Sequence, residues 1–198
     1  MLELLTGSGL ALSAGLNAFI PMLSIGLLAR YTDLVELPAA WAWLENPWAL
    51  GVLAVLLVLD VVADKVPAVD HVNDVIQTVV RPTAGGIVFA AGSSSETPAI
   101  TDPGEFFTSS AVVPFIIGLI LALSTHLAKA SGRAVVNLST GGIGAPVVST
   151  VEDVSSLTMT VLAILVPVLV VVFLLILLAM GFWIRQKLAQ RRRERALG

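Results

Sequence analysis

Long apolar runs limit how this chain can fold more than any other feature of its sequence. The longest, residues 157–184, contains 28 residues, and about 20 apolar residues in a helix already cross the ~30 Å hydrocarbon core of a bilayer. The composition agrees, because 57% of the residues are hydrophobic and 13% are charged, whereas soluble domains carry about 25% charged residues. We therefore expect an all-α integral membrane protein.

About six transmembrane segments are expected, at residues 9–29, 48–63, 72–92, 111–128, 134–151 and 157–184. Two of them are expected to be broken, the third by Pro82 with Gly85 and Gly86, and the fifth by the glycines before Pro146. Four spans plus two re-entrant segments is the alternative count. The N-terminus is interpreted as part of the first membrane helix and not as a cleaved signal, because no basic residue precedes its apolar run.

The arginine-rich tail, residues 185–198, sets the expected orientation, and residues 1–184 form the single membrane domain before it. Basic residues gather on the cytoplasmic side of a membrane, so the tail is predicted to be cytoplasmic. It is expected to contact anionic lipids and not nucleic acid. With six crossings the N-terminus is cytoplasmic as well, the tryptophan-rich segment 31–48 lies outside, and Arg30 is the exception. The expected location is the inner membrane of the cell.

A dense set of polar and ionisable residues interrupts the apolar runs. Such groups are costly in lipid and normally face a bundle interior or a water-filled cavity, where they mark functional sites. Asp60 and Asp64, for example, lie four residues apart and share one helix face. A buried ion-pair network without transport is the competing interpretation. The candidate residues for an ion or solute path are Asn17, Asp60, Asp64, Lys65, Asp70, His71, Asp74, Arg81, His126, Lys129, Arg133 and Asn137.

Three of these residues, Asp70, His71 and Asp74, have a spacing that suits a divalent cation. On a regular helix the two carboxylates share a face while His71 points about 100° away, so a three-ligand site needs a distorted helix. No other cofactor is expected, since the chain has no cysteine and its glycine-rich stretch 140–144 lacks the lysine of a phosphate-binding loop. No nucleophile and base pair is recognisable, so an enzyme is not expected.

A shift of 64 residues reveals a weak internal repeat. It aligns Lys65 with Lys129, Asn73 with Asn137 and Pro82 with Pro146. Paired, interrupted segments in the two halves of a chain are typical of transporter sites. Chance matches in a sequence rich in valine and alanine are the alternative explanation.

Three groups of motifs carry a family resemblance: residues 15–21, residues 64–70 with 81–85, and residues 126–137 with 149–153. Together they resemble a group of small bacterial multi-pass membrane proteins classed as a domain of unknown function. The chain departs from that pattern at Ala145, where a polar residue is expected before Pro146. The resemblance implies a membrane location and brings no established substrate or reaction.

These features favour an α-helical transporter or channel for an ion or a small solute. Its polar path is expected where the broken segments 67–86 and 137–146 meet near the bilayer centre, because half-helix ends supply dipoles for charged solutes. A homodimer is compatible with this function, because so small a chain has few helices with which to enclose a path. The alternative is a non-transporting accessory or scaffold subunit of a larger membrane complex.

Overall fold

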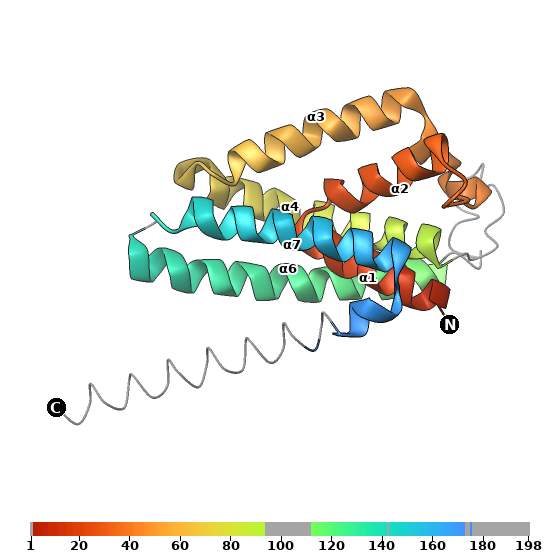
Figure 1. Ribbon diagram of the computed structural model, residues 1–198. Helices are drawn as coiled ribbons and strands as arrows, with labels where there is room; N and C mark the ends of the chain where they lie inside the picture. Colours follow the sequence, from red (N-terminus) through yellow and green to blue (C-terminus); the bar gives the residue numbers. More distant parts are fainter. Residues whose placement is uncertain (1, 94–111, 142, 173–174, 176–198) are drawn as a thin grey trace.

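The computed structural model describes residues 2–93, 112–141, 143–172 and 175, apart from the side chains of Pro67, Ala68, Asp70 and His71. The regular elements in these residues are all helical (Figure 1). They are α1 (Leu2–Leu16), α2 (Phe19–Tyr31), the 3-10 helix η1 (Ala39–Glu45), α3 (Pro47–Ala63), α4 (Pro67–Gly92), α6 (Val112–Thr140) and α7 (Ala145–Leu165).

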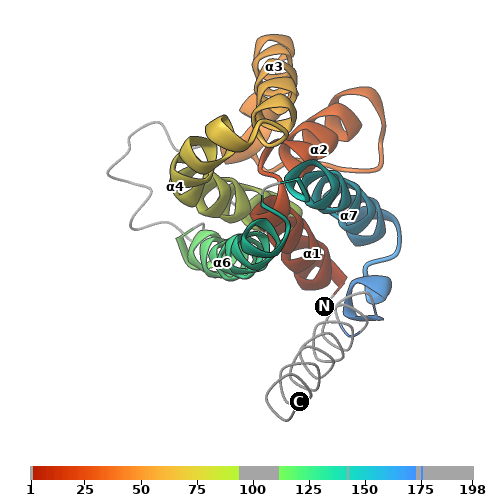
Figure 2. The same ribbon diagram turned by 90° about the vertical axis from the view of Figure 1, so that its left-hand side faces the viewer.

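Helix α1 lies at the centre of the bundle, where it contacts α2, α4, α6 and α7 (Figure 2). Its buried face consists largely of small residues, which let helix backbones approach closely. A Cβ added to Gly15, for instance, would lie 2.4 Å from the carbonyl oxygen of Ala122 on α6. Helix α3 stands at the periphery and packs against α2, η1 and α4.

The first expected crossing, residues 9–29, is wrong, because α1 and α2 form a hairpin. The chain turns back after Leu16, so that Leu10 of α1 and Ile25 of α2 line the same small pocket. Figure 1 accordingly shows the N-terminus and the end of α2 at the same end of the bundle. Asn17 causes the turn: its Oδ1 accepts hydrogen bonds from the backbone N–H groups of Phe19 (3.0 Å) and Ile20 (3.3 Å) and so caps α2.

The expected break in the third segment is also wrong, since α4 is one helix of 26 residues with Pro82 inside it. Membrane helices tolerate an internal proline when neighbouring groups satisfy the freed backbone. The two glycines that follow serve packing against α6. A Cβ on Gly85 would lie 2.2 Å from the Cβ of Ala122, and one on Gly86 would lie 2.7 Å from the ring of Phe115.

The expected segments 111–128 and 134–151 are wrong as separate spans, because α6 is one helix of 29 residues that continues from the first segment into the second and ends at Thr140. The chain turns only after Thr140, where Gly141 adopts a φ of +63°, and Pro146 lies in the first turn of α7. Helix α7 in turn ends at Leu165 before a non-helical Val166. The run 157–184 is therefore not a single helix, and most of its second half lies outside the described residues.

Three described helices are long and apolar enough to cross a membrane: Val72–Gly92, Val112–Thr140 and Ala145–Leu165. A fourth span is possible by length if η1 and α3, which are bent by 66° to each other, count as one. The structure therefore supports a helical membrane protein but does not confirm six crossings. The proposed repeat is not reflected in the helices either, since Lys65 follows the end of α3 whereas Lys129 lies inside α6.

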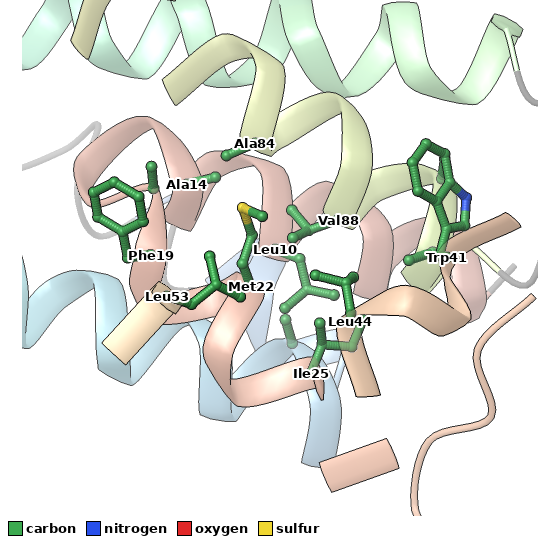
Figure 3. Close-up of a cluster of buried hydrophobic side chains, with 14 of the residues drawn as sticks. Leu10, Ala14, Phe19, Met22, Ile25, Trp41, Leu44, Leu53, Ala84 and Val88 are labelled. Atoms are coloured by element: carbon green, nitrogen blue, oxygen red, sulfur yellow. The ribbon is translucent and has the colours of Figure 1, made fainter. Parts of the chain in front are cut away.

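The apolar core runs along α1 and α2 and includes residues of η1, α3, α4 and α7. Leu10, Met22, Ile25, Leu44 and Val88 are among its members (Figure 3). The outer faces of α3 and α4 expose further large apolar side chains, as a lipid-facing surface requires. Charged side chains gather inside the bundle towards the tip of the α1–α2 hairpin and the junction of α3 and α4.

Candidate functional site

Three cationic groups converge on one carboxylate oxygen at the centre of the site. Oδ2 of Asp64, at the end of α3, lies 3.5 Å from Nη2 of Arg81, 3.3 Å from Nζ of Lys129 and 3.1 Å from Nη2 of Arg133. The Asp64 side chain is only 1% exposed. The two helices α4 and α6, which pack closely, supply all three cations.

Glu152 of α7 is a second buried carboxylate in this cluster. Its Oε2 lies 3.1 Å from Nζ of Lys129 and accepts a hydrogen bond from Arg133. Glu152 was not among the candidates. It lies in the interior of α7, because that helix begins at Ala145. The clue in the sequence is its three-residue spacing from Ser149, which is also buried on the same helix face.

The buried charges balance within the described residues. Six Asp, Glu, Lys and Arg side chains are at most 9% exposed, and they comprise three acidic and three basic groups: Asp60, Asp64, Glu152, Arg81, Lys129 and Arg133. Buried ions in proteins are normally paired in this way, because an unpaired buried charge costs several kcal/mol.

A set of amides connects the two aspartates of α3. Nδ2 of Asn73 donates to Oδ1 of Asp60 (2.7 Å) and to Oδ1 of Asp64 (2.8 Å), and Nε2 of Gln77 donates to Oδ1 of Asp60 (2.7 Å). Asn73 and Gln77 were not among the candidates. They lie four residues apart on α4 and continue to Arg81 at the same spacing, so the inward face of this helix was visible in the sequence.

The tip of the α1–α2 hairpin reaches the same cluster. Nζ of Lys129 donates to the backbone carbonyl of Leu16 at the end of α1 (3.0 Å). Nδ2 of Asn17 donates to Oδ1 of Asp153 on α7 (3.0 Å). Lys65, which is 38% exposed, lies 3.7 Å from Oδ2 of Asp153 and so marks the edge of the cluster.

His126 is buried between two helices. Its Nδ1 lies 3.4 Å from Nη1 of Arg81, and its Nε2 lies 3.1 Å from the hydroxyl of Thr78. A guanidinium can only donate, so Nδ1 is the acceptor and the ring hydrogen sits on Nε2. His126 is also the middle residue of α6, about 21 Å along the axis from either end. The cluster extends from His126 towards the C-terminal end of α6, through Lys129 and Arg133, and meets Asp64 at the junction of α3 and α4.

The remaining candidates lie away from this centre. Asp74 is partly buried, with Oδ1 3.8 Å from Nη1 of Arg133, and Asn137 is half-buried one helical turn beyond Arg133. The side chains of Asp70 and His71 lie outside the described residues. Among the side chains that are described, no group of three or more His, Cys, Asp or Glu could hold a metal ion.

Several buried polar atoms in the described cluster have no hydrogen-bond partner. They are Oδ2 of Asp60, Oε1 of Gln77, Nε and Nη2 of Arg81, Oδ1 of Asn137 and Oγ of Ser149. Leaving a buried polar atom unsatisfied costs about 1–3 kcal/mol, so native proteins satisfy such atoms with ordered water or a ligand. The chemistry of the cluster thus suits a hydrated or solute-binding site.

Comparison with curated proteins and with solved structures finds no match. A family model, in contrast, matches residues 4–187, which is nearly the whole chain and includes every residue of the cluster. The chain belongs to the family described as a domain of unknown function, DUF4126.

Proposed function

We propose that this protein is a membrane transporter or channel for an ion or a small solute, with a polar path through the cluster around Asp64. The observation that carries the proposal is the burial of six balanced charges inside a bundle with an apolar outer surface. Replacing a buried ion network by apolar residues is often neutral or stabilising. A buried ion network inside a membrane bundle therefore favours a function in moving charge or polar solutes.

The α1–α2 hairpin supports the same proposal. Two half-helices meet at the cluster, with the carbonyl end of α1 facing Lys129 and the start of α2 beside Asp153. Helices that end inside the membrane direct their dipoles at transported ions and are common in transporters. These half-helix ends lie at residues 16–19 and not at the expected breaks 67–86 and 137–146.

The hairpin also changes the topology that we propose. The N-terminus lies at the same end of the bundle as the segment after α2, so α1 and α2 enter the membrane together and leave on the same side. That end carries the acids Glu3, Asp33 and Glu36, whereas Lys65 lies at the other end. The positive-inside rule then places Lys65 and the basic tail in the cytoplasm and the N-terminus outside. We propose the bacterial inner membrane as the location.

Flux through the purified protein in liposomes tests the proposal. Bilayer currents report ions, and light scattering after an osmotic step reports neutral solutes. Asp64→Asn and Lys129→Ala should abolish the flux while the protein stays folded by circular dichroism. The matched controls Asp33→Asn and Arg30→Gln change the same kinds of charge at exposed positions at the far end and should leave the flux unchanged. Flux no greater than that of empty liposomes would contradict the proposal.

An accessory subunit of a larger membrane complex is the second candidate. Trp43 and Trp48 favour it, because they are 44% and 85% exposed and lie on η1 and in the first turn of α3. Aromatic residues are enriched at protein interfaces, although the headgroup zone of a membrane also favours tryptophan. Purification of the protein from its native membrane under mild conditions distinguishes the two functions, since an accessory subunit should bring its complex with it.

A further inference from the structure

We propose that Arg81, Lys129 and Arg133 form a binding site for a small oxyanion, and that the carboxylate of Asp64 occupies this site in the present conformation. The inference rests on the proposed transport function and names the class of its solute. Three observations support it. The three cations share one oxygen of Asp64, two buried N–H groups of Arg81 have no hydrogen-bond partner, and α3, which carries Asp64, lies at the edge of the bundle.

Three cations lie within 3.5 Å of Oδ2 of Asp64, which is one more than the two lone pairs of this oxygen can bind. One carboxylate oxygen accepts about two strong hydrogen bonds, and Lys129 and Arg133 take these at 3.3 and 3.1 Å. Arg81 is left at 3.5 Å from this oxygen and 3.7 Å from Oδ2 of Asp60, with no hydrogen bond from Nη2 to either. An oxyanion with three or four oxygens would give each cation an oxygen of its own.

Arg81 itself shows that the present arrangement satisfies the donors poorly. Its side chain is 0% exposed, yet neither Nε nor Nη2 has a hydrogen-bond partner among the described residues. These two groups form the fork with which a guanidinium binds carboxylate, phosphate or sulfate oxygens in pairs. A fully buried fork with unused donors, next to an oxygen that two further cations share, is an arrangement that recognises an oxyanion.

The competing carboxylate sits on the element that is best placed to move. Asp64 follows the last residue of α3, which lies at the edge of the bundle and packs on α2, η1 and α4. The three cations belong to α4 and α6, which pack closely on each other and on α1. Outward movement of α3 would withdraw Asp60 and Asp64 together. Glu152 and the partly buried Asp74 would then face three cations, and the net positive charge that remains suits an oxyanion.

Anion titrations of the purified protein in neutral-lipid nanodiscs test the site. Sodium sulfate, phosphate and acetate are added at constant ionic strength, and binding is followed by calorimetry. Asp64→Asn should tighten sulfate binding about tenfold or more, because the carboxylate no longer competes with sulfate for the three cations. A hydrogen bond to a charged group contributes at least about a tenfold factor in affinity. Glu152→Gln makes the same change of charge but touches only two cations, so it should tighten binding less.

Removing one of the three cations should weaken sulfate binding, whereas removing the Asp64 carboxylate should tighten it. Lys129→Gln should abolish sulfate binding, while Arg30→Gln, an exposed site at the far end, should leave it unchanged. The double variant Asp64→Asn with Lys129→Gln removes one negative and one positive charge, so it should fold even if Asp64→Asn alone does not. This double variant should not bind sulfate. Absence of anion binding, equal binding by native protein and Lys129→Gln, or no tightening in folded Asp64→Asn would overturn the inference.

Flux measurements separate this inference from the proposed function. Binding of an oxyanion without its transport in liposomes would leave the site standing and contradict the transporter. Transport of a cation without anion binding would support the transporter and contradict the oxyanion site. Uptake of radiolabelled sulfate or phosphate that is lost in Lys129→Gln is the result expected if both hold.

Discussion

Replacing Gly85 by alanine tests whether the packing of α4 on α6 holds the charged cluster in place. The new Cβ would lie 2.2 Å from the Cβ of Ala122, against an ordinary contact of 3.4–4 Å. Both atoms are fixed to backbone, so the helices must separate by about 1 Å or more. Such overpacking costs about 1–3 kcal/mol, and alanine regains up to about 1 kcal/mol of helix propensity. We therefore expect a net loss of about 1–2 kcal/mol.

The same shift should reach the site, because Arg81 lies one turn before Gly85 on α4. Thermal unfolding in detergent, followed by tryptophan fluorescence, measures the stability, and liposome flux measures the function. The matched control is Gly51→Ala on α3: no atom lies within 4 Å of its new Cβ, so it should stabilise by about 0.5–1 kcal/mol. Adding Ala122→Gly to Gly85→Ala should restore part of the loss. Equal stability of Gly85→Ala and Gly51→Ala would refute this reasoning.

Three further predictions concern the buried charges, the hairpin and the topology. Lys129→Gln alone should destabilise by about 3–5 kcal/mol because it leaves three buried carboxylates with only two buried cations, and adding Glu152→Gln should recover much of this in chemical unfolding. Asn17→Ala should cost about 1–2 kcal/mol in the same assay through loss of the α2 cap, and a neutral result would mean that the hairpin does not depend on it. The chain has no cysteine, so single cysteines at Glu3 and Lys65 can be compared in intact cells: an impermeant maleimide should label the first and not the second, and the reverse pattern would invert the proposed orientation.

The convergence of charges could be expected from the sequence because it depends on local spacing and on the cost of charge in lipid. Asp60 and Asp64 share a face at a four-residue interval, and Lys129 and Arg133 repeat that interval on α6. Whatever the number of spans, such faces must turn inward at membrane depth. Which carboxylate meets which cation depends on helices far apart in the chain, and local spacing carries no information on that.

The positions of the helix breaks were harder to predict, because the same residue types serve different purposes. Gly85 was expected to belong to a helix break, but it lies where α4 contacts α6 closely. Asn17 looked like a residue within a kinked span and ends one helix while capping the next. The polar stretch around Gly132 looked like a loop but stays helical, since Lys129 and Arg133 turn into the bundle. Tertiary partners decide each case.

Lys129 connects the hairpin, the cluster and the peripheral helix through a single ammonium group. Its Nζ donates to the carbonyl of Leu16 at 3.0 Å and to Asp64 at 3.3 Å, and it forms an ion pair with Glu152 at 3.1 Å. Leu16 and Glu152 belong to α1 and α7, which pack on each other, whereas Asp64 belongs to the outer helix α3. Any motion that opens the cluster must give up one of these contacts. Loss of the longest one, by movement of α3, leaves the hairpin tip and α7 anchored and frees a position on Lys129 for a solute.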